Sequence, residues 1–465
     1  MTATAPAAHL LTPEVARRRY ATVCALFWFP IGLYVPSLVL LLGERGLALA
    51  AVAALLSAQG LTVAALELPT GGLSDVLGRK TVLATGGVLC LAAFVLLGLG
   101  TAPWLLITAI LLMATSRALA SGPAEAWYVD MAQAHSGPDA ELRSGLSRGS
   151  AAMSASLAVG TLLGGLIPWL LGSTGVAEAT GGVIVPLSVP ALIGAAVELC
   201  YIGYVLLRLP EPPRPPATLR SVLGGVPGTI VSGVRLATGE RVVRKVVLTT
   251  AAVGAALGAI ELLTPGRAAG ITGASESGAV VYAGLATAGF ASSALGARLA
   301  PLVARLAGSS GRAVLASLAG MTCGLALLGV TAPGDGQSAS TPAVVTGILG
   351  YVLVYLCLGS AGPNENDLLH HRVASSARAT ALSVQSLALQ AVAALGGLVA
   401  GVLPLGPLPL LLTAAVVGAG ALMWVRAVPD GPPPGHPDGA DALAASAASG
   451  EPVAERAVGR EKGTR

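Results

Sequence analysis

Charged side chains are scarce in this sequence, and their scarcity excludes a water-soluble fold. Asp, Glu, Lys and Arg together make up 11% of the 465 residues, whereas 54% of the residues are hydrophobic. A soluble protein cannot bury so large an apolar fraction and still present a polar surface. Glycine, in contrast, is abundant: 61 glycines suit close contact between helices in lipid. The sequence therefore predicts an integral membrane protein.

Cysteine and recognisable catalytic motifs are also sparse. The five cysteines lie inside apolar runs, without the spacing of a metal or redox site: Cys24, Cys90, Cys200, Cys323 and Cys357. No Gly-x-x-x-x-Gly-Lys-Ser/Thr loop is present, so ATP is not expected to be the energy source. We predict no enzyme activity, no cofactor and no metal site.

Long apolar runs dominate the chain. Each is about long enough to cross a hydrocarbon core of ~30 Å as a helix. The runs do not alternate between apolar and polar residues, which favours helices over the strands of a β-barrel. The first run, residues 20–43, is too long for a signal peptide and is predicted to be retained. Twelve runs are expected, centred near Gly32, Gly60, Cys90, Leu112, Gly160, Ala196, Gly254, Leu285, Gly320, Leu353, Leu389 and Val416. The predicted fold class is an all-α integral membrane protein with 12 transmembrane helices.

The positions of Lys and Arg predict the orientation in the membrane. With a cytoplasmic N-terminus, 20 of the 27 basic residues fall in cytoplasmic segments, and only Arg45 and Arg267 fall outside. Such a bias is typical of the cytoplasmic loops of membrane proteins. We therefore expect a multi-pass protein of the plasma (cell inner) membrane with both termini in the cytoplasm. The net charge of +4 then reflects orientation, and no nucleic-acid partner is expected.

A proline cluster and an internal repeat divide the chain into two halves. Prolines from Pro210 onwards stop the sixth span, because proline cannot continue a helix. Gly-Pro-Ala-Glu ending at Glu125 has a counterpart, Gly-Pro-Asn-Glu ending at Glu365, 240 residues later. This repeat indicates a duplicated bundle. The predicted segments are 1–19, a cytoplasmic N-terminal segment; 20–208, a six-helix bundle; 209–244, a cytoplasmic loop with an amphipathic helix; 245–428, a second six-helix bundle; and 429–465, a disordered cytoplasmic tail.

A charged turn between the second and third spans carries the most specific motif. It resembles the Gly-x-Leu-Ala/Ser-Asp-x-x-Gly-Arg-Lys signature of the major facilitator superfamily, matched at Gly71, Leu73, Ser74, Asp75, Gly78, Arg79 and Lys80. The resemblance implies a transporter with two pseudo-symmetric six-helix bundles. It also implies that Asp75 and Arg79 are gating residues and that Lys80 is a weaker orientation charge. Glu125 and Asp130 are the candidate acids for pairing with Arg79.

Ionisable residues at membrane depth are the candidates for proton coupling, because they are costly there and are kept for function. Arg117, in the fourth span, resembles the span-four arginine of proton-coupled members of the superfamily. A buried ion pair without coupling function is the alternative. Glu67, Glu198 and Glu261 are candidates for a carboxyl that exchanges protons. A helix-end or cavity charge is the alternative for each of them.

Two further features bear on the substrate. Gly160, Gly164 and Gly165 resemble part of the glycine motif of drug–proton antiporters, although Ser156 and Thr161 depart from it, and plain helix packing explains the same spacing. Trp28, Phe29 and Tyr34 are candidates for an apolar-aromatic cavity. Lipid contact or packing is the alternative for them.

Together these features favour a secondary transporter that works by alternating access. Its expected partners are a small-molecule substrate, protons and the lipid bilayer, and it is expected to be a monomer. Proton-coupled efflux of a small, largely apolar compound is the first hypothesis, since the cavity candidates are mostly apolar. Proton-coupled uptake of a metabolite or sugar, and a transport-inactive membrane receptor, are the alternatives.

Overall fold

The computed structural model describes residues 11–120, 122–137, 140–211, 231, 235, 238–334, 339–372 and 375–425; the side chains of 68–72, 75 and 370–380 are not described. The tail expected over 429–465 lies outside these residues. Most of the amphipathic helix expected within 209–244 also lies outside them.

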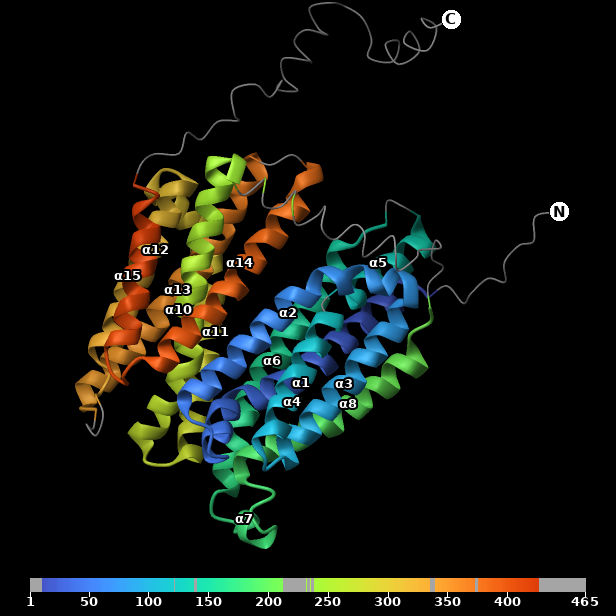
Figure 1. The fold of residues 1–465 in the computed structure, drawn as a ribbon. Helices are drawn as coiled ribbons and strands as arrows, with labels where there is room; N and C mark the ends of the chain where they lie inside the picture. Colours follow the sequence, from blue (N-terminus) through green and yellow to red (C-terminus); the bar gives the residue numbers. More distant parts are fainter. Residues whose placement is uncertain are drawn as a thin grey trace, which may run out of the picture.

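The described residues form α-helices, one short 3₁₀-helix and their connections (Figure 1). The first half of the chain contains α1 Pro13–Glu44, α2 Leu49–Leu77, α3 Arg79–Leu99, α4 Pro103–Ala120, α5 Pro123–Ser136, α6 Arg143–Leu171, α7 Val176–Ala179, η1 Pro186–Ser188 and α8 Val189–Arg208. The second half contains α10 Arg241–Thr272, α11 Ser275–Ala307, α12 Ser310–Val330, α13 Thr341–Arg372, α14 Ser375–Val402 and α15 Leu408–Leu422.

Within the described residues, 11 helical segments are long and apolar enough to cross a membrane. One of them, Pro103–Ser136, joins α4 and α5, which are interrupted just before Pro123. The apolar run near Val416 forms α15, but its 15 residues rise only ~22 Å at 1.5 Å per residue, less than the hydrocarbon thickness. The expected count of 12 spanning helices is therefore not confirmed.

Two helices begin earlier than the apolar pattern predicts. α1 begins at Pro13, within the segment expected to precede the first bundle, and α10 begins at Arg241, within the expected central loop. Polar capping explains the second start, because the Glu240 carboxylate accepts hydrogen bonds from the backbone N–H groups of Val242 and Val243. A carboxylate at this position also interacts favourably with the helix dipole.

The helix contacts repeat between the two halves. α1 packs on α6 in the first half as α10 packs on α14 in the second, and α3 packs on α4 as α12 packs on α13. The most extensive contacts between the halves are those of α2 with α14 and of α6 with α11, and α1 also contacts α10 and α11. α2 and α11 occupy equivalent positions in the two halves, as do α6 and α14, so exchanging the halves converts the α2–α14 pair into the α11–α6 pair. This is the pattern of two bundles related by a pseudo-two-fold axis.

The two ends of the molecule differ. α1 begins and α15 ends on the same side, which we call the terminal end, and α7 lies on the opposite side, the α7 end (Figure 1). The halves meet closely near the α7 end. There a Cβ atom at Gly165 of α6 would lie 2.5 Å from Ala283 Cβ of α11, and one at Gly401 of α14 would lie 2.3 Å from Ala53 Cβ of α2.

Candidate functional site

Three adjoining cavities lie between the two halves, and Arg117 lines all three of them. Their volumes are about 310, 290 and 320 Å³. The first is lined by α2, α4, α10 and α14, so it receives side chains from both halves. The second reaches α11 and α13, and the third reaches α5 and α6. We call the three together the central cavity.

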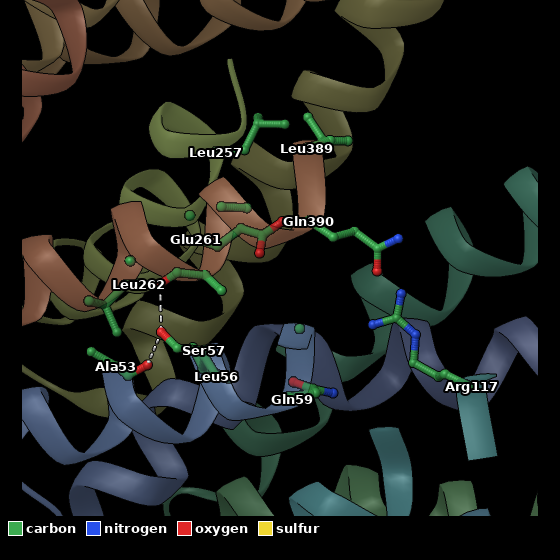
Figure 2. Close-up of a pocket in the computed structure, with 15 residues that line it drawn as sticks. Ala53, Leu56, Ser57, Gln59, Arg117, Leu257, Glu261, Leu262, Leu389 and Gln390 are labelled. Atoms are coloured by element: carbon green, nitrogen blue, oxygen red, sulfur yellow. Dashed lines mark hydrogen bonds between the residues drawn. The ribbon is translucent and has the colours of Figure 1, made fainter. Parts of the chain in front are cut away.

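Arg117 and Glu261 face the central cavity from opposite halves. Arg117 lies in the last turn of α4, and Glu261 lies in α10 with its side chain exposed to the cavity. Figure 2 shows the Arg117 guanidinium directed towards Gln390, with Glu261 on the other side of that amide. Among the described residues, Arg117 forms no ion pair within 4.0 Å. A cation and an anion therefore share the cavity without neutralising each other by direct contact.

Two buried polar groups in the cavity wall have no hydrogen-bond partner among the described residues. Gln59 is only 7% exposed, and Thr161 is fully buried. Among the described residues, neither Gln59 Nε2 nor Thr161 Oγ1 has a hydrogen-bond partner. Both residues line the part of the cavity next to α11 and α13. Buried polar groups are costly unless they are hydrogen-bonded, so a rearrangement of the cavity wall that gives these two atoms a partner would be favourable.

Aromatic side chains form the wall on the α11–α13 side. Of the three aromatic candidates from the sequence, Trp28 and Tyr34 of α1 line the cavity, whereas Phe29 is not among the residues lining the three cavities. The second half supplies further rings that the sequence analysis missed: Tyr282, Phe290, Tyr351 and Tyr355. The rings of Tyr351 and Tyr355 are 4.8 Å apart at an angle of 31°. Their spacing of four residues, which puts two rings on one helix face, was the available signal.

The part of the cavity towards the terminal end contains two acidic residues. Glu67, Glu125 and Cys24 line it together with Arg117 and Gln390. Gln390 Nε2 donates a hydrogen bond to Glu67 Oε2 at 3.2 Å, and this contact joins α14 to α2 across the two halves. Glu67, Arg117 and Glu261 are thus brought to one connected cavity.

Glu198 does not belong to this cavity. It is 0% exposed in α8 and lines none of the three cavities. Neither of its carboxyl oxygens has a hydrogen-bond partner among the described residues. Its place is the interior of the first half, so the four predicted coupling residues fall into two separate environments.

The signature between α2 and α3 forms a compact turn. Gly78, with φ +100°, ends α2 and precedes α3, a conformation that favours glycine. Arg79 Nε donates to Asp130 Oδ2 at 3.2 Å, and its guanidinium also contacts the Ser74 hydroxyl. The backbone N–H of Lys80 donates to Glu211 Oε2 at 3.2 Å.

Of the two acids suggested for Arg79, Asp130 is therefore its partner, and Glu125 lies at the cavity instead. Arg79 and Asp130 both belong to the first half, so their ion pair does not join the halves. Gly71 and Asp75 fall within α2, at positions whose side chains are not described.

The glycines of the fifth span have two different roles in packing. Gly160 and Gly164 face the backbone of α1: a Cβ at Gly164 would lie 2.0 Å from the Leu33 carbonyl oxygen. Gly165 faces α11 in the other half. The resemblance to the antiporter motif is thus accounted for, at these positions, by close helix contact.

Comparison with known proteins identifies the family. The model of the Major Facilitator Superfamily matches residues 21–397. No curated protein matches the sequence. A solved structure of the nucleoside transporter NupG is similar over 88% of this chain and 97% of that chain, with TM-score 0.65 and 14% identity. A peptide transporter POT in complex with sulfate is similar over 88% and 93%, with TM-score 0.63 and 15% identity. A POT family transporter in complex with 5-aminolevulinic acid is similar over 88% and 94%, with TM-score 0.63 and 15% identity. At such identities the likeness of these structures shows the fold alone.

Proposed function

Because the chain belongs to the Major Facilitator Superfamily, we propose that it exchanges protons for a small organic compound and exports that compound across the plasma membrane. The observation that carries the proposal is that Arg117 and Glu261, from opposite halves, line one cavity. A site between two bundles can be exposed to each side of the membrane in turn when the bundles rock against each other. Both termini, in this proposal, lie in the cytoplasm, and the monomer is the working unit.

Electrostatic interactions in the cavity couple proton binding to substrate binding. A carboxyl group in a poorly hydrated site favours its neutral form, and a nearby cation favours the ionised form. Arg117 faces Glu261 without contacting it. An occupant between them therefore changes the balance between the neutral and the ionised form of the Glu261 carboxyl. A substrate that binds the Glu261 carboxylate therefore competes with a proton for the same group. Such competition produces antiport. Glu67, at the same cavity, is the second candidate carboxyl, and Glu198 is a third that acts from inside the first half.

The lining also narrows the substrate class. The sequence favoured a largely apolar compound, but Gln59, Thr161 and Gln390 add amide and hydroxyl groups to the wall. The Gln59 Nε2 donor needs an acceptor, and the tyrosine rings suit a planar ring. We propose a substrate that combines an aromatic ring with at least one polar or charged group.

Uptake of a polar metabolite is the second candidate. The same polar lining favours it, and the structural neighbours include proteins described as nucleoside and peptide transporters. The direction of the proton gradient that drives accumulation separates the two candidates. A transport-inactive receptor would bind substrate but carry none in either direction.

The gating part of the proposal rests on the signature. Asp75 and Arg79 would hold the terminal ends of the helices in the closed state, with Lys80 as an orientation charge. The ion pair of Arg79 with Asp130 supports a role in shaping this turn. It anchors α3 to α5, so that the turn moves with the first half as a unit.

The experiment measures transport into proteoliposomes in which the protein is inserted in one orientation. Candidate compounds are screened with the pH higher inside and, separately, with the pH higher outside. Glu261→Gln should abolish accumulation driven by the gradient and leave exchange at equal pH largely intact, because glutamine mimics the protonated carboxyl but cannot release a proton. Glu276→Gln, in the first turn of α11 and outside the cavity lining, is the matched control. If Glu261→Gln still accumulates substrate against its gradient, proton coupling at this residue is wrong.

A further inference from the structure

The second half contains a buried carboxyl that the central cavity does not use. Glu365, the repeat counterpart of Glu125, lies in α13 and is 5% exposed. Glu125 is exposed and lines the central cavity, whereas Glu365 faces α10 and α14. Two residues at equivalent positions of the repeat thus occupy opposite environments, one hydrated and one excluded from water.

Three side chains surround the Glu365 carboxyl, and all are uncharged. Thr249 Oγ1 lies 3.2 Å from Glu365 Oε1, and Thr250 Oγ1 lies 3.2 Å from Oε2. Gln385 Nε2 lies 3.3 Å from Oε2 and 3.1 Å from Thr250 Oγ1. Thr249 is 0% and Thr250 9% exposed. Among the described side chains, the hydrogen-bond partners of this buried carboxyl are all neutral.

Charged groups on the neighbouring helices do not neutralise Glu365. Among the described residues, no ion pair involves it. The Nζ atom of Lys245, one turn before Thr249 on α10, lies 5.4 Å from the centre of the Trp424 ring. Asp367 of α13 accepts a hydrogen bond from Ser310. The other charged residues with described side chains on the terminal halves of the helices packed against α13 are Arg241, Arg244, Arg298, Arg305 and Arg312. Arg372 of α13 and Arg378 of α14 lie at the same ends of their helices, and their side chains are not described.

The count of hydrogen atoms favours a protonated carboxyl. Thr249 has one hydroxyl proton, and its oxygen lies closer to the carbonyls of Lys245 and Val246, at 2.9 and 3.0 Å, than to Glu365. When that proton goes to a carbonyl, Thr249 Oγ1 can only accept from Glu365, which requires a proton on Oε1. Oε2 then accepts from the Thr250 hydroxyl and from Gln385. Every donor in this arrangement has an acceptor, and no charge is buried.

We propose that Glu365 is a proton-binding site of the second half, occupied in this conformation and separate from the central cavity. Because α10, α13 and α14 enclose it, its proton leaves only when these helices separate enough to admit water. The assignment concerns proton binding and does not depend on the identity of the transported compound.

The proposal is tested by infrared spectroscopy of the purified full-length protein, which detects the carbonyl stretch of protonated carboxyl groups at neutral pH. Glu365→Gln should remove one such band, whereas Glu125→Gln, at the equivalent position of the first half, should leave that band in place. Loss of no band in Glu365→Gln, in protein that elutes as a folded monodisperse species, overturns the assignment.

Two threonine variants test the same site if Glu365→Gln does not fold. Thr249→Val removes the oxygen that accepts the carboxyl proton, so the band should disappear at a lower pH than in the wild type. Thr250→Val removes a donor to the carboxylate, so the band should persist to a higher pH. Shifts in opposite directions support the proposed hydrogen-bond arrangement, and shifts of one sign or no shift contradict it. Transport that stays normal in these variants would leave the function proposed for the central cavity intact.

Discussion

Replacing Gly165 should separate the two halves at the α7 end without unfolding either of them. Gly165 lies near the end of α6, and its missing side chain allows α11 to approach. A Cβ atom there would lie 2.5 Å from Ala283 Cβ, 2.6 Å from the Ala279 carbonyl oxygen and 2.9 Å from Val280 Cα. Two of these three are backbone atoms, which cannot rotate away. The clash therefore has to be relieved by movement of α11 relative to α6.

The size of the effect follows from the cost of overpacking. Extra methyl groups in a close contact typically cost about 1–3 kcal/mol. Gly165→Val places this cost only on the conformation in which α6 and α11 touch, so it acts on the conformational equilibrium. Since about 1.4 kcal/mol corresponds to a tenfold change, the variant should shift the population towards opening at the α7 end by about 5–150-fold.

The assay measures the distance between two spin labels at the α7 end. Cysteines at Ala179 and Ala274, both exposed, would carry the labels in a background without the native cysteines. Gly165→Val should lengthen the distance and slow turnover. Gly266→Ala, a helix position where a Cβ meets nothing within 4 Å, should change neither. An unchanged distance distribution together with wild-type transport rates would refute the reasoning.

Three further predictions concern separate parts of the molecule. Asp130→Asn removes the ion pair of Asp130 with Arg79, whose side chains are 32% and 17% exposed, and should lower the free energy of unfolding by at most ~1 kcal/mol. A loss of all folded protein would contradict a local role. Arg117→Lys keeps the positive charge but loses the planar guanidinium with its several donors, so substrate flux should fall several-fold at unchanged expression. Wild-type flux would show that the charge alone suffices. Trp127→Phe removes the hydrogen bond from Nε1 to the Pro210 carbonyl, 2.9 Å long, and should cost about 1 kcal/mol, measured as a lower unfolding temperature; an unchanged temperature would mean that water replaces the indole.

The helices could be predicted from the sequence because lipid leaves the backbone few choices. A chain in hydrocarbon must satisfy its own N–H and C=O groups, so a long apolar run is a helix almost by necessity. The ends of the helices were less predictable, because polar turns extend them beyond the apolar part. The extension of α1 back to Pro13 and the start of α10 behind Glu240 are examples. A short final helix such as α15 also looks like a full span when its flanking residues are counted.

Charged site residues were also predictable, since a charge within an apolar run is conspicuous. Arg117 and Glu261 were found for this reason, and the structure places both at the central cavity. Gln59, Gln390 and Thr161 were missed, because uncharged polar residues in membrane helices commonly serve packing. Their role depends on which helix faces which, and that is a property of contacts between distant segments. The same applies to the separation of Glu198 from the cavity.

The two most extensive contacts between the halves are built from the same kind of residue, and this similarity constrains how the molecule can move. Gly165 meets Ala283 where α6 crosses α11, and Gly401 meets Ala53 where α14 crosses α2. Both crossings lie towards the α7 end, and a pseudo-two-fold axis exchanges them. Small residues at both places allow a close fit without interlocking side chains, so the two contacts can open together with little cost in side-chain rearrangement. Opening at the α7 end therefore has to break both contacts at once. A larger side chain at either crossing should therefore shift this one conformational equilibrium towards opening at the α7 end.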